Sequence, residues 1–159
     1  MVDDQGSWRE RRREASAVQA AALERRKAAE TEQARAQLVE FVQKMKEKGI
    51  QPGLLRAPVV GSGASYRTGI TGWYLRRNRS LGVDTDGNFY ILGAPASLKA
   101  RLVGVRISPS DPPLTVGLGA RDGESLPLKK LLRLRLEEID DAQRQAGGET
   151  QKPEHPGAD

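Results

Sequence analysis

The stretch from Gly72 to Gly93 most constrains the fold of this 159-residue chain, because its apolar residues fall at every second position between turn sequences. Side chains of a β-strand alternate between the two faces of a sheet, so this spacing is typical of half-buried strands. Between two of the runs, Asp86-Gly87 is a strong hairpin signal, since glycine accepts the positive φ of a tight turn. The stretch predicts a three-stranded antiparallel meander whose inward residues are Trp73, Leu75, Leu81, Val83, Phe89 and Ile91.

Two further runs extend this pattern beyond the meander. Residues 102–108 and 114–118 again alternate apolar and polar positions, which predicts a five-stranded antiparallel sheet over residues 70–122. Several glycines fall on the face opposite the apolar one, and glycine within a strand marks a bulge or a close approach of other groups. An open sheet and a sheet curled towards a small barrel are both compatible with these glycines.

A long helix is predicted over residues 8–48, which contain no Gly or Pro and are rich in Ala, Glu, Gln, Arg and Lys. Its last turns carry an apolar stripe that begins at Leu38, so residues 38–48 are expected to pack on the sheet domain. Residues 8–30 lack an apolar seam and include a basic cluster, which favours a solvated helix. A weak dimer or a partner-binding helix is the alternative for that half.

The other segments complete an α+β domain plan. A C-terminal amphipathic helix is predicted over residues 125–145, with Ser125 as N-cap and Pro127 in the first turn. Residues 49–69, rich in Gly and Pro, are expected to be a connector. The polar ends, 1–7 and 146–159, are expected to be disordered.

The composition removes most familiar catalytic chemistry. There is no Cys, and the one histidine, His155, lies in the polar tail, so nucleophile–histidine pairs and the common zinc sites are not expected. Asp84 and Asp86 could share a metal ion, but the spacing of a calcium loop fails, and a hairpin turn explains both residues. We therefore expect no catalytic residue, no metal and no cofactor, with an enzyme of unrecognised type as an alternative.

Charge is concentrated in one part of the chain. Residues 49–108 contain eight basic and two acidic residues, a net charge of +6, whereas the whole chain carries +5. Tyrosine and arginine side chains fall on the predicted sheet face opposite the apolar one, which favours an anionic or peptide partner there. The alternative is that the tyrosines cover the neighbouring glycines. The candidate partner-binding residues are Tyr74, Arg76, Arg77, Arg79, Tyr90 and Arg106.

The sequence thus predicts a small non-enzymatic binding or adaptor module for a protein or anionic partner, with self-association through the N-terminal helix as one possibility. A nucleic-acid-associated protein is the alternative, although the aromatic signature of the common RNA-binding sheet is missing. No apolar run approaches the roughly 20 residues that span a bilayer, and the first residues do not resemble a secretory signal. A cytoplasmic location and no membrane partner are expected.

Overall fold

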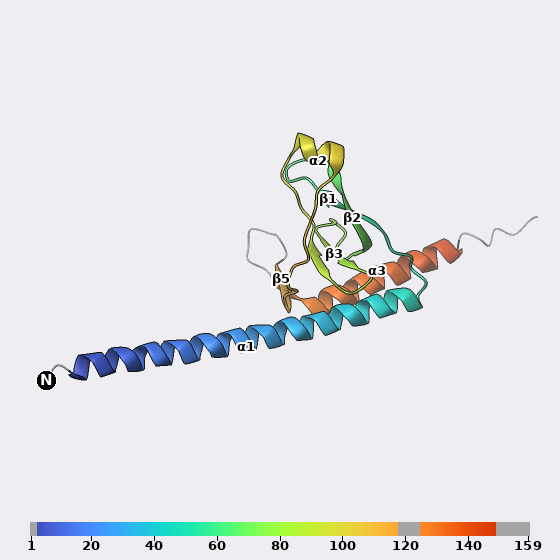
Figure 1. Ribbon diagram of the computed structural model, residues 1–159. Coiled ribbons are helices and arrows are strands. Elements are labelled where there is room, and N and C mark those ends of the chain that lie inside the picture. The colour runs from blue at the N-terminus through green and yellow to red at the C-terminus, as the bar shows by residue number, and fades with distance from the viewer. Residues whose placement is uncertain (1–2, 118–124, 149–159) are drawn as a thin grey trace, which may run out of the picture.

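The computed structural model describes residues 3–117 and 125–148, and confirms the α+β class with long helices before and after the sheet. Helix α1 (Asp3–Glu47) is one continuous helix of 45 residues. Its N-terminal part projects far from the body of the molecule, and only its C-terminal part lies beside the sheet and helix α3 (Leu128–Gly148) (Figure 1). The predicted start at residue 8 was too late, since residues 3–7 are also helical. None of the helices described is long and apolar enough to cross a bilayer.

The predicted meander is confirmed as part of a four-stranded antiparallel sheet. Its strands are β1 (Gly53–Pro58), β2 (Ser65–Tyr74), β3 (Leu81–Asp84) and β4 (Phe89–Ile91), in the order β1-β2-β3-β4. Val83 faces Trp73 on one side and Phe89 on the other, as the alternation requires, but Ile91, which was predicted to point inwards, is 58% exposed. Gly87 has a φ of 89° in the β3–β4 turn, which is the reason that glycine stands there.

The expected connector over residues 49–69 was wrong in its main part, because β1 and the first half of β2 lie within it. Leu55, Ala57 and Val59 alternate inwards and are buried, but the glycines and Pro58 around them look like breakers in the sequence. Pro58 ends a strand at the edge of the sheet, where a missing backbone N–H costs no ladder bond.

The strand predicted over residues 102–108 was also wrong. Helix α2 (Leu98–Val103) occupies its first positions, with the Ser97 hydroxyl accepting the Ala100 N–H at 3.2 Å and Gly104 ending the helix. Beyond it the chain carries no regular structure as far as Ser108, although the Val105 N–H donates to the Arg67 carbonyl at 2.8 Å. Val105 and Ile107 are half-buried without a strand partner. Their alternation therefore reflects packing of their side chains against the core and not hydrogen bonding within a sheet.

The predicted fifth strand exists but does not join the main sheet. Strand β5 (Thr115–Gly117) pairs with β6 (Ser125–Pro127) in a separate two-stranded hairpin, and the four-stranded sheet does not close into a barrel. Strand β6 uses the residues predicted to begin the C-terminal helix. The Leu128 N–H donates to the Leu114 carbonyl at 2.7 Å, so α3 begins three residues later than expected and continues to Gly148. The disorder expected for residues 1–2 and 149–159, and the end of the predicted strand at Leu118, lie outside the described residues.

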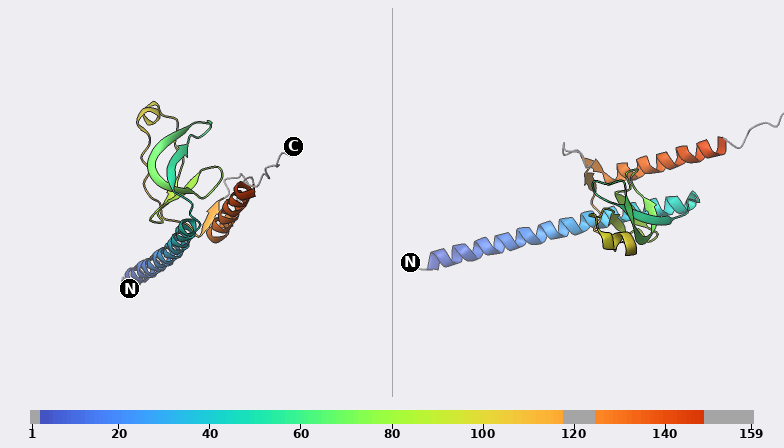
Figure 2. Two further views of the ribbon diagram at one scale, coloured as in Figure 1. Left: turned by 90° about the vertical axis from the view of Figure 1, so that its right-hand side faces the viewer. Right: turned by 90° about the horizontal axis from the view of Figure 1, so that it is seen from above.

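The main core lies between one face of the sheet and the two long helices. Leu38, Phe41 and Met45 of α1 are almost completely buried against Trp73 of β2, Leu75 just after it and the first turns of α3. Figure 2 shows α3 running alongside the C-terminal part of α1. This confirms that the last turns of α1 belong to the folded body.

The opposite face of the sheet is covered as well. Leu55, Tyr90 and Leu92 form one small cluster there, and Ala57, Val59, Tyr66 and Ala94 form another. A Cβ at Gly82 would lie 2.8 Å from Leu55 Cδ1 and 2.9 Å from Leu92 Cδ1, so this strand glycine makes room for the second core. Close packing therefore explains Gly82 without a ligand.

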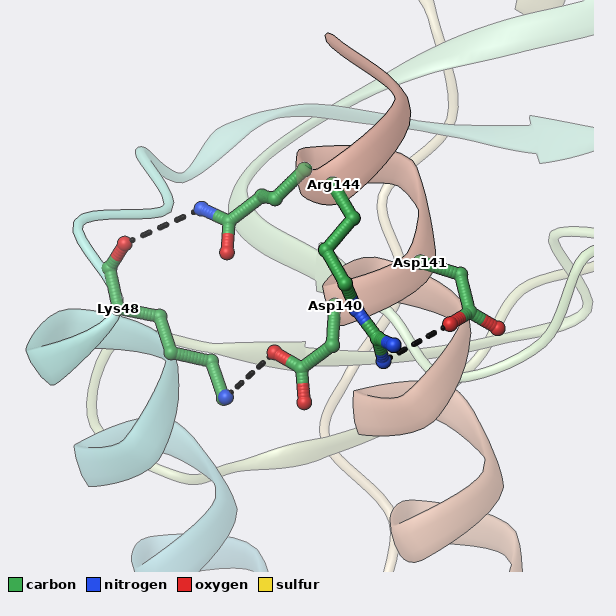
Figure 3. A network of polar contacts seen from close by, with 5 residues as sticks. Lys48, Asp140, Asp141 and Arg144 are labelled. Carbon is green, nitrogen blue, oxygen red and sulfur yellow. Dashed lines mark hydrogen bonds and ion pairs between the residues drawn. The ribbon is translucent and has the colours of Figure 1, made fainter. Parts of the chain in front are cut away.

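Polar contacts join the C-terminal ends of the two long helices. Lys48 Nζ lies 2.5 Å from Asp140 Oδ1, and the Gln143 side chain donates to the Lys48 carbonyl at 3.3 Å. In α3, Arg144 also pairs with Asp141 at 3.0 Å (Figure 3). These contacts fix the turn that leads from α1 into β1.

Candidate binding surfaces

The structure separates the six predicted binding residues into three places. Four of them, at the end of β2 and in the turn after it, lie together beside α3. Arg76 donates to the Gly117 carbonyl at 2.6 Å, and Arg77 pairs with Glu138 of α3 at 3.1 Å. The Arg79 guanidinium lies 5.6 Å from the centre of the Tyr74 ring. Two of these arginines are thus engaged by the protein's own carbonyl and carboxylate groups.

The other two predicted residues, Tyr90 and Arg106, do not belong to this group, and each has a different environment. Tyr90 is buried in the second core, and its hydroxyl donates to Asp84 Oδ2 at 3.0 Å, so its ring is not available for stacking on a ligand. Arg106 is exposed and follows α2, next to Arg67 and Lys99. Tyr74 is half-buried, and its hydroxyl accepts the Arg56 N–H at 2.8 Å.

Asp84 organises the β3–β4 turn. Its Oδ1 accepts the N–H groups of Asp86 and Asn88, and its Oδ2 accepts the Asn88 amide and the Tyr90 hydroxyl, all within 3.0 Å. Partial burial opposes ionisation, but these hydrogen bonds outweigh it and hold the pKa of Asp84 below its ordinary value. Burial and the bond to Asp84 raise the pKa of Tyr90. Because its oxygens already accept four hydrogen bonds, Asp84 is explained by its role in stabilising the hairpin turn.

The end of the body that carries α2 is rich in cations. Five cationic side chains gather there and form what we call the cationic end, consisting of Arg56, Arg67, Lys99, Arg101 and Arg106. Arg56 and Arg67 face each other across β1 and β2, a cross-strand pairing of like charges that costs stability. Within the described part of the chain, none of the five forms an ion pair.

The acidic residues of the same region lie at the opposite side of the body. From residue 49 to residue 110 the only acids are Asp84 and Asp86, in a turn where Lys46 of α1 donates to the Thr85 carbonyl at 3.3 Å. The next acid, Asp111, pairs with Arg35 of α1 at 2.9 Å. Because the carboxylates stay close to α1, the field of the cationic end is not cancelled locally.

Two hollows flank α2 and are lined by these cations. One, of about 890 Å³, is bordered by Arg67, Lys99 and Arg106. The other, of about 640 Å³, is bordered by Arg56, Arg67 and Arg101. Sequence reasoning found Arg106 but missed the other four, because two lie in the supposed connector and two in a helix that was not predicted. The net charge of residues 49–108 was the signal that contained them.

A groove away from the cationic end lies between α1 and α3. This groove, of about 470 Å³, has an apolar floor that includes Phe41, Leu132 and Leu136, and lysines and an arginine on its rim. The Gln37 Oε1 atom beside it is buried without a hydrogen-bond partner in the described residues. Glu40 on the rim is engaged by Lys44 at 2.9 Å, and this hydrogen bond and charge lower the pKa of Glu40.

Comparison with known proteins adds no relative to this picture: no protein-family model matches the chain, and neither a curated protein nor a solved structure is found to be similar to it.

Proposed function

We propose that this protein is a non-enzymatic binding module that engages an anionic partner through its cationic end. The observation that supports this proposal is the gathering of five cations, without a carboxylate among them, on one end of the body. A folded domain places like charges together at a cost, and an anionic partner would offset that cost. Lacking Cys, and with its one histidine in the tail, the chain offers little for common catalytic sites.

The five side chains differ in how firmly they are held. The Arg56 guanidinium donates to Ser65, and the Arg67 guanidinium donates to the Leu102 carbonyl at 3.1 Å. Lys99, Arg101 and Arg106 are exposed, and no hydrogen bond from their side chains to another described residue is formed. We propose that Arg56 and Arg67 hold the surface in place. The three exposed cations, Lys99, Arg101 and Arg106, would then contact the partner.

The proposal is tested by reversing the charge of the three exposed cations. The triple variant Lys99→Glu, Arg101→Glu, Arg106→Glu is compared with a control, Arg25→Glu, Lys27→Glu, Arg133→Glu, that changes the net charge equally on α1 and α3. The probes are polyglutamate and a DNA duplex, titrated at several salt concentrations. We expect the wild type to bind with an affinity that falls steeply with salt, because bound cations release counterions.

The first variant is expected to bind at least about tenfold more weakly than the control. If both variants lose the same affinity, net charge and not this end of the body explains the binding. If the wild type binds neither these probes nor any other anionic surface at low salt, the proposal fails. A preference for the duplex over polyglutamate would instead favour a nucleic-acid-associated protein.

A second candidate function is a protein contact through the projecting part of α1. Residues 4–30 are exposed along their whole length, including the apolar side chains of Trp8, Val18 and Leu23. Most helical stability in proteins comes from packing an apolar face, which residues 4–30 lack, so contact with a second copy or another helix would stabilise this segment. Light scattering of the full chain and of residues 31–159 tests this: a mass that rises with concentration only in the full chain supports self-association.

A further inference from the structure

Helix α2 presents an unusual apolar ridge to solvent. Leu98, Leu102 and Val103 are 81%, 76% and 71% exposed, and no residue of this helix is buried. Leu98 and Leu102, at positions i and i+4, lie on the same face of the helix, and Val103 lies about 100° further round it. Isolated exposed apolar residues are ordinary, but two leucines and a valine together on a helix of six residues point to a binding surface.

The ridge stands at the tip of the body. In Figure 1 and in the left view of Figure 2, α2 lies at the end of the sheet farthest from α1 and α3. Leu98 borders one of the two cation-lined hollows and Val103 borders the other. A protruding apolar strip therefore has cationic side chains on both of its flanks.

The ridge is also held rigidly to the body. The Tyr66 hydroxyl accepts the Ser97 N–H at 2.8 Å at the start of α2, and Arg67 binds the Leu102 carbonyl near its end. Both anchoring residues belong to β2. Since the exposed leucines are fixed in place by the sheet, little ordering is needed when a partner is bound.

We infer that α2 is a peripheral membrane contact, inserting Leu98, Leu102 and Val103 among the headgroups of an anionic lipid surface while the flanking cations bind lipid phosphates. This inference rests on the proposed function and names the partner of the same end. Apolar side chains add burial in the interface, and each nearby Lys or Arg adds attraction to anionic lipid. The helix is too short to enter deeply, so the contact is reversible and superficial.

Other anionic partners fit the ridge less well. A single-stranded nucleic acid is usually held by stacking on exposed aromatic rings, but α2 contains none, and Tyr66 beside it is buried. An acidic peptide would pair with the cations of the hollows but would leave the protruding Leu98 and Leu102 without apolar contact. A plane of headgroups above acyl chains matches a protruding apolar strip with cations on both sides.

The sequence favoured no membrane contact because it contains no spanning segment. It also gave no sign of an apolar surface at α2, because residues 102–108 were predicted to form a strand. In a strand, Leu102 and Val103 would point to opposite faces. In α2, by contrast, Leu102 lies directly beside Leu98 on one face, and Val103 follows next to them around the helix.

Vesicle binding tests the inference. Vesicles of phosphatidylcholine, with or without about 30% phosphatidylserine, are sedimented with the protein. The variant Leu98→Ser, Leu102→Ser removes apolar surface from exposed positions, and Leu54→Ser, at a β1 residue that is 75% exposed, is the matched control. We expect binding only to the anionic vesicles, about tenfold weaker for the double variant and unchanged for the control.

A labelling experiment reports insertion directly. Because the chain has no Cys, Leu102→Cys provides a single attachment point for an environment-sensitive fluorophore, with Leu54→Cys as control. Emission from position 102 should shift to the blue on anionic vesicles, and emission from position 54 should not.

The outcomes separate the inference from the proposed function. Binding to polyglutamate or DNA without binding to anionic vesicles overturns the membrane contact and leaves the anionic-partner proposal standing. Vesicle binding that the double leucine variant retains in full, without a shift at position 102, also overturns it. Failure to bind any of these anions at low salt removes both.

Discussion

The hydroxyl of Tyr90 donates a hydrogen bond to Asp84 across the β3–β4 hairpin, with 3.0 Å between the two oxygens. This bond ties a buried ring of the second core to the carboxylate that organises the turn. It also explains why the sheet face that carries Tyr90 offers no open aromatic surface, since the ring packs with Leu55 and Leu92.

The same bond predicts a pH dependence of stability. The pKa of Asp84 is lower in the folded protein than its ordinary value, so ionised Asp84 stabilises the fold at neutral pH. That stabilisation is present above the ordinary pKa and is lost as the pH falls from about 4 through the lower folded value. Urea unfolding of wild type and Asp84→Asn should therefore differ by about 1–2 kcal/mol near neutral pH, and by less at acid pH.

The control for this experiment is Asp86→Asn, because the Asp86 side chain makes no hydrogen bond or ion pair with a described residue. Its stability should follow that of the wild type across the pH range. A difference between wild type and Asp84→Asn that stays constant down to acid pH would contradict the role assigned to the ionised carboxylate.

Close packing at Gly82 gives a second prediction. The methyl group of Gly82→Ala would meet Leu55 and Leu92 at less than 3.0 Å, so the second core must shift to accept it. We expect a loss of about 1–3 kcal/mol in the free energy of unfolding. Gly93→Ala, where nothing lies within 4 Å of the added carbon, should stay close to the wild type. Equal stability of the two variants would mean that Gly82 is not needed for packing.

The ion pair between Lys48 and Asp140 allows a third prediction. Both side chains are partly sheltered, and they join the end of α1 to α3 at 2.5 Å. A double-mutant cycle with Lys48→Met and Asp140→Asn should give a coupling free energy approaching 1 kcal/mol, because partial burial reduces screening. The exposed pair Arg26 and Glu30 in α1, measured in the same way, should give less. A coupling free energy near zero for Lys48 and Asp140 would show that this ion pair adds no stability.

Much of the fold could be predicted where local patterns were complete. The alternation from Trp73 to Phe89 and the Asp86-Gly87 turn predicted three strands, and the absence of Gly and Pro from residues 8–48 predicted all of α1 except its first turn, which contains Gly6. The patterns failed where two signals competed. Val103, Val105 and Ile107 alternate, but the Ser97 cap and Gly104 place the first of them in a helix. Leu55, Ala57 and Val59 alternate too, but glycines and Pro58 conceal the strand.

Of the candidate site, only the excess of positive charge in its segment of the chain could be predicted. The excess of basic residues in 49–108 is visible in the sequence, whereas the gathering of Arg56, Arg67 and Arg101 depends on the pairing of β1 with β2 and on the position of α2. The exposure of Leu98 is likewise set by tertiary structure. Neither a pairing register nor a solvent-facing side of a short helix is encoded by spacing alone.

The last prediction concerns the two parts of α1. Every residue from 4 to 30 is exposed, and the first buried side chain of the helix is Ala34. A chain that begins at residue 31 keeps Leu38, Phe41 and Met45 in the main core, so its melting temperature should stay within a few degrees of that of the full chain.

A chain that begins at residue 49 loses all three, at about 1.5–3 kcal/mol for each buried side chain, against a total stability of about 5–15 kcal/mol. Thermal unfolding followed by circular dichroism should show no cooperative transition for this shorter chain. Two truncations of equal stability would mean that the end of α1 is not part of the core. Because the cationic end lies on the far side of the sheet, the chain that begins at residue 31 should also bind polyglutamate as the full chain does.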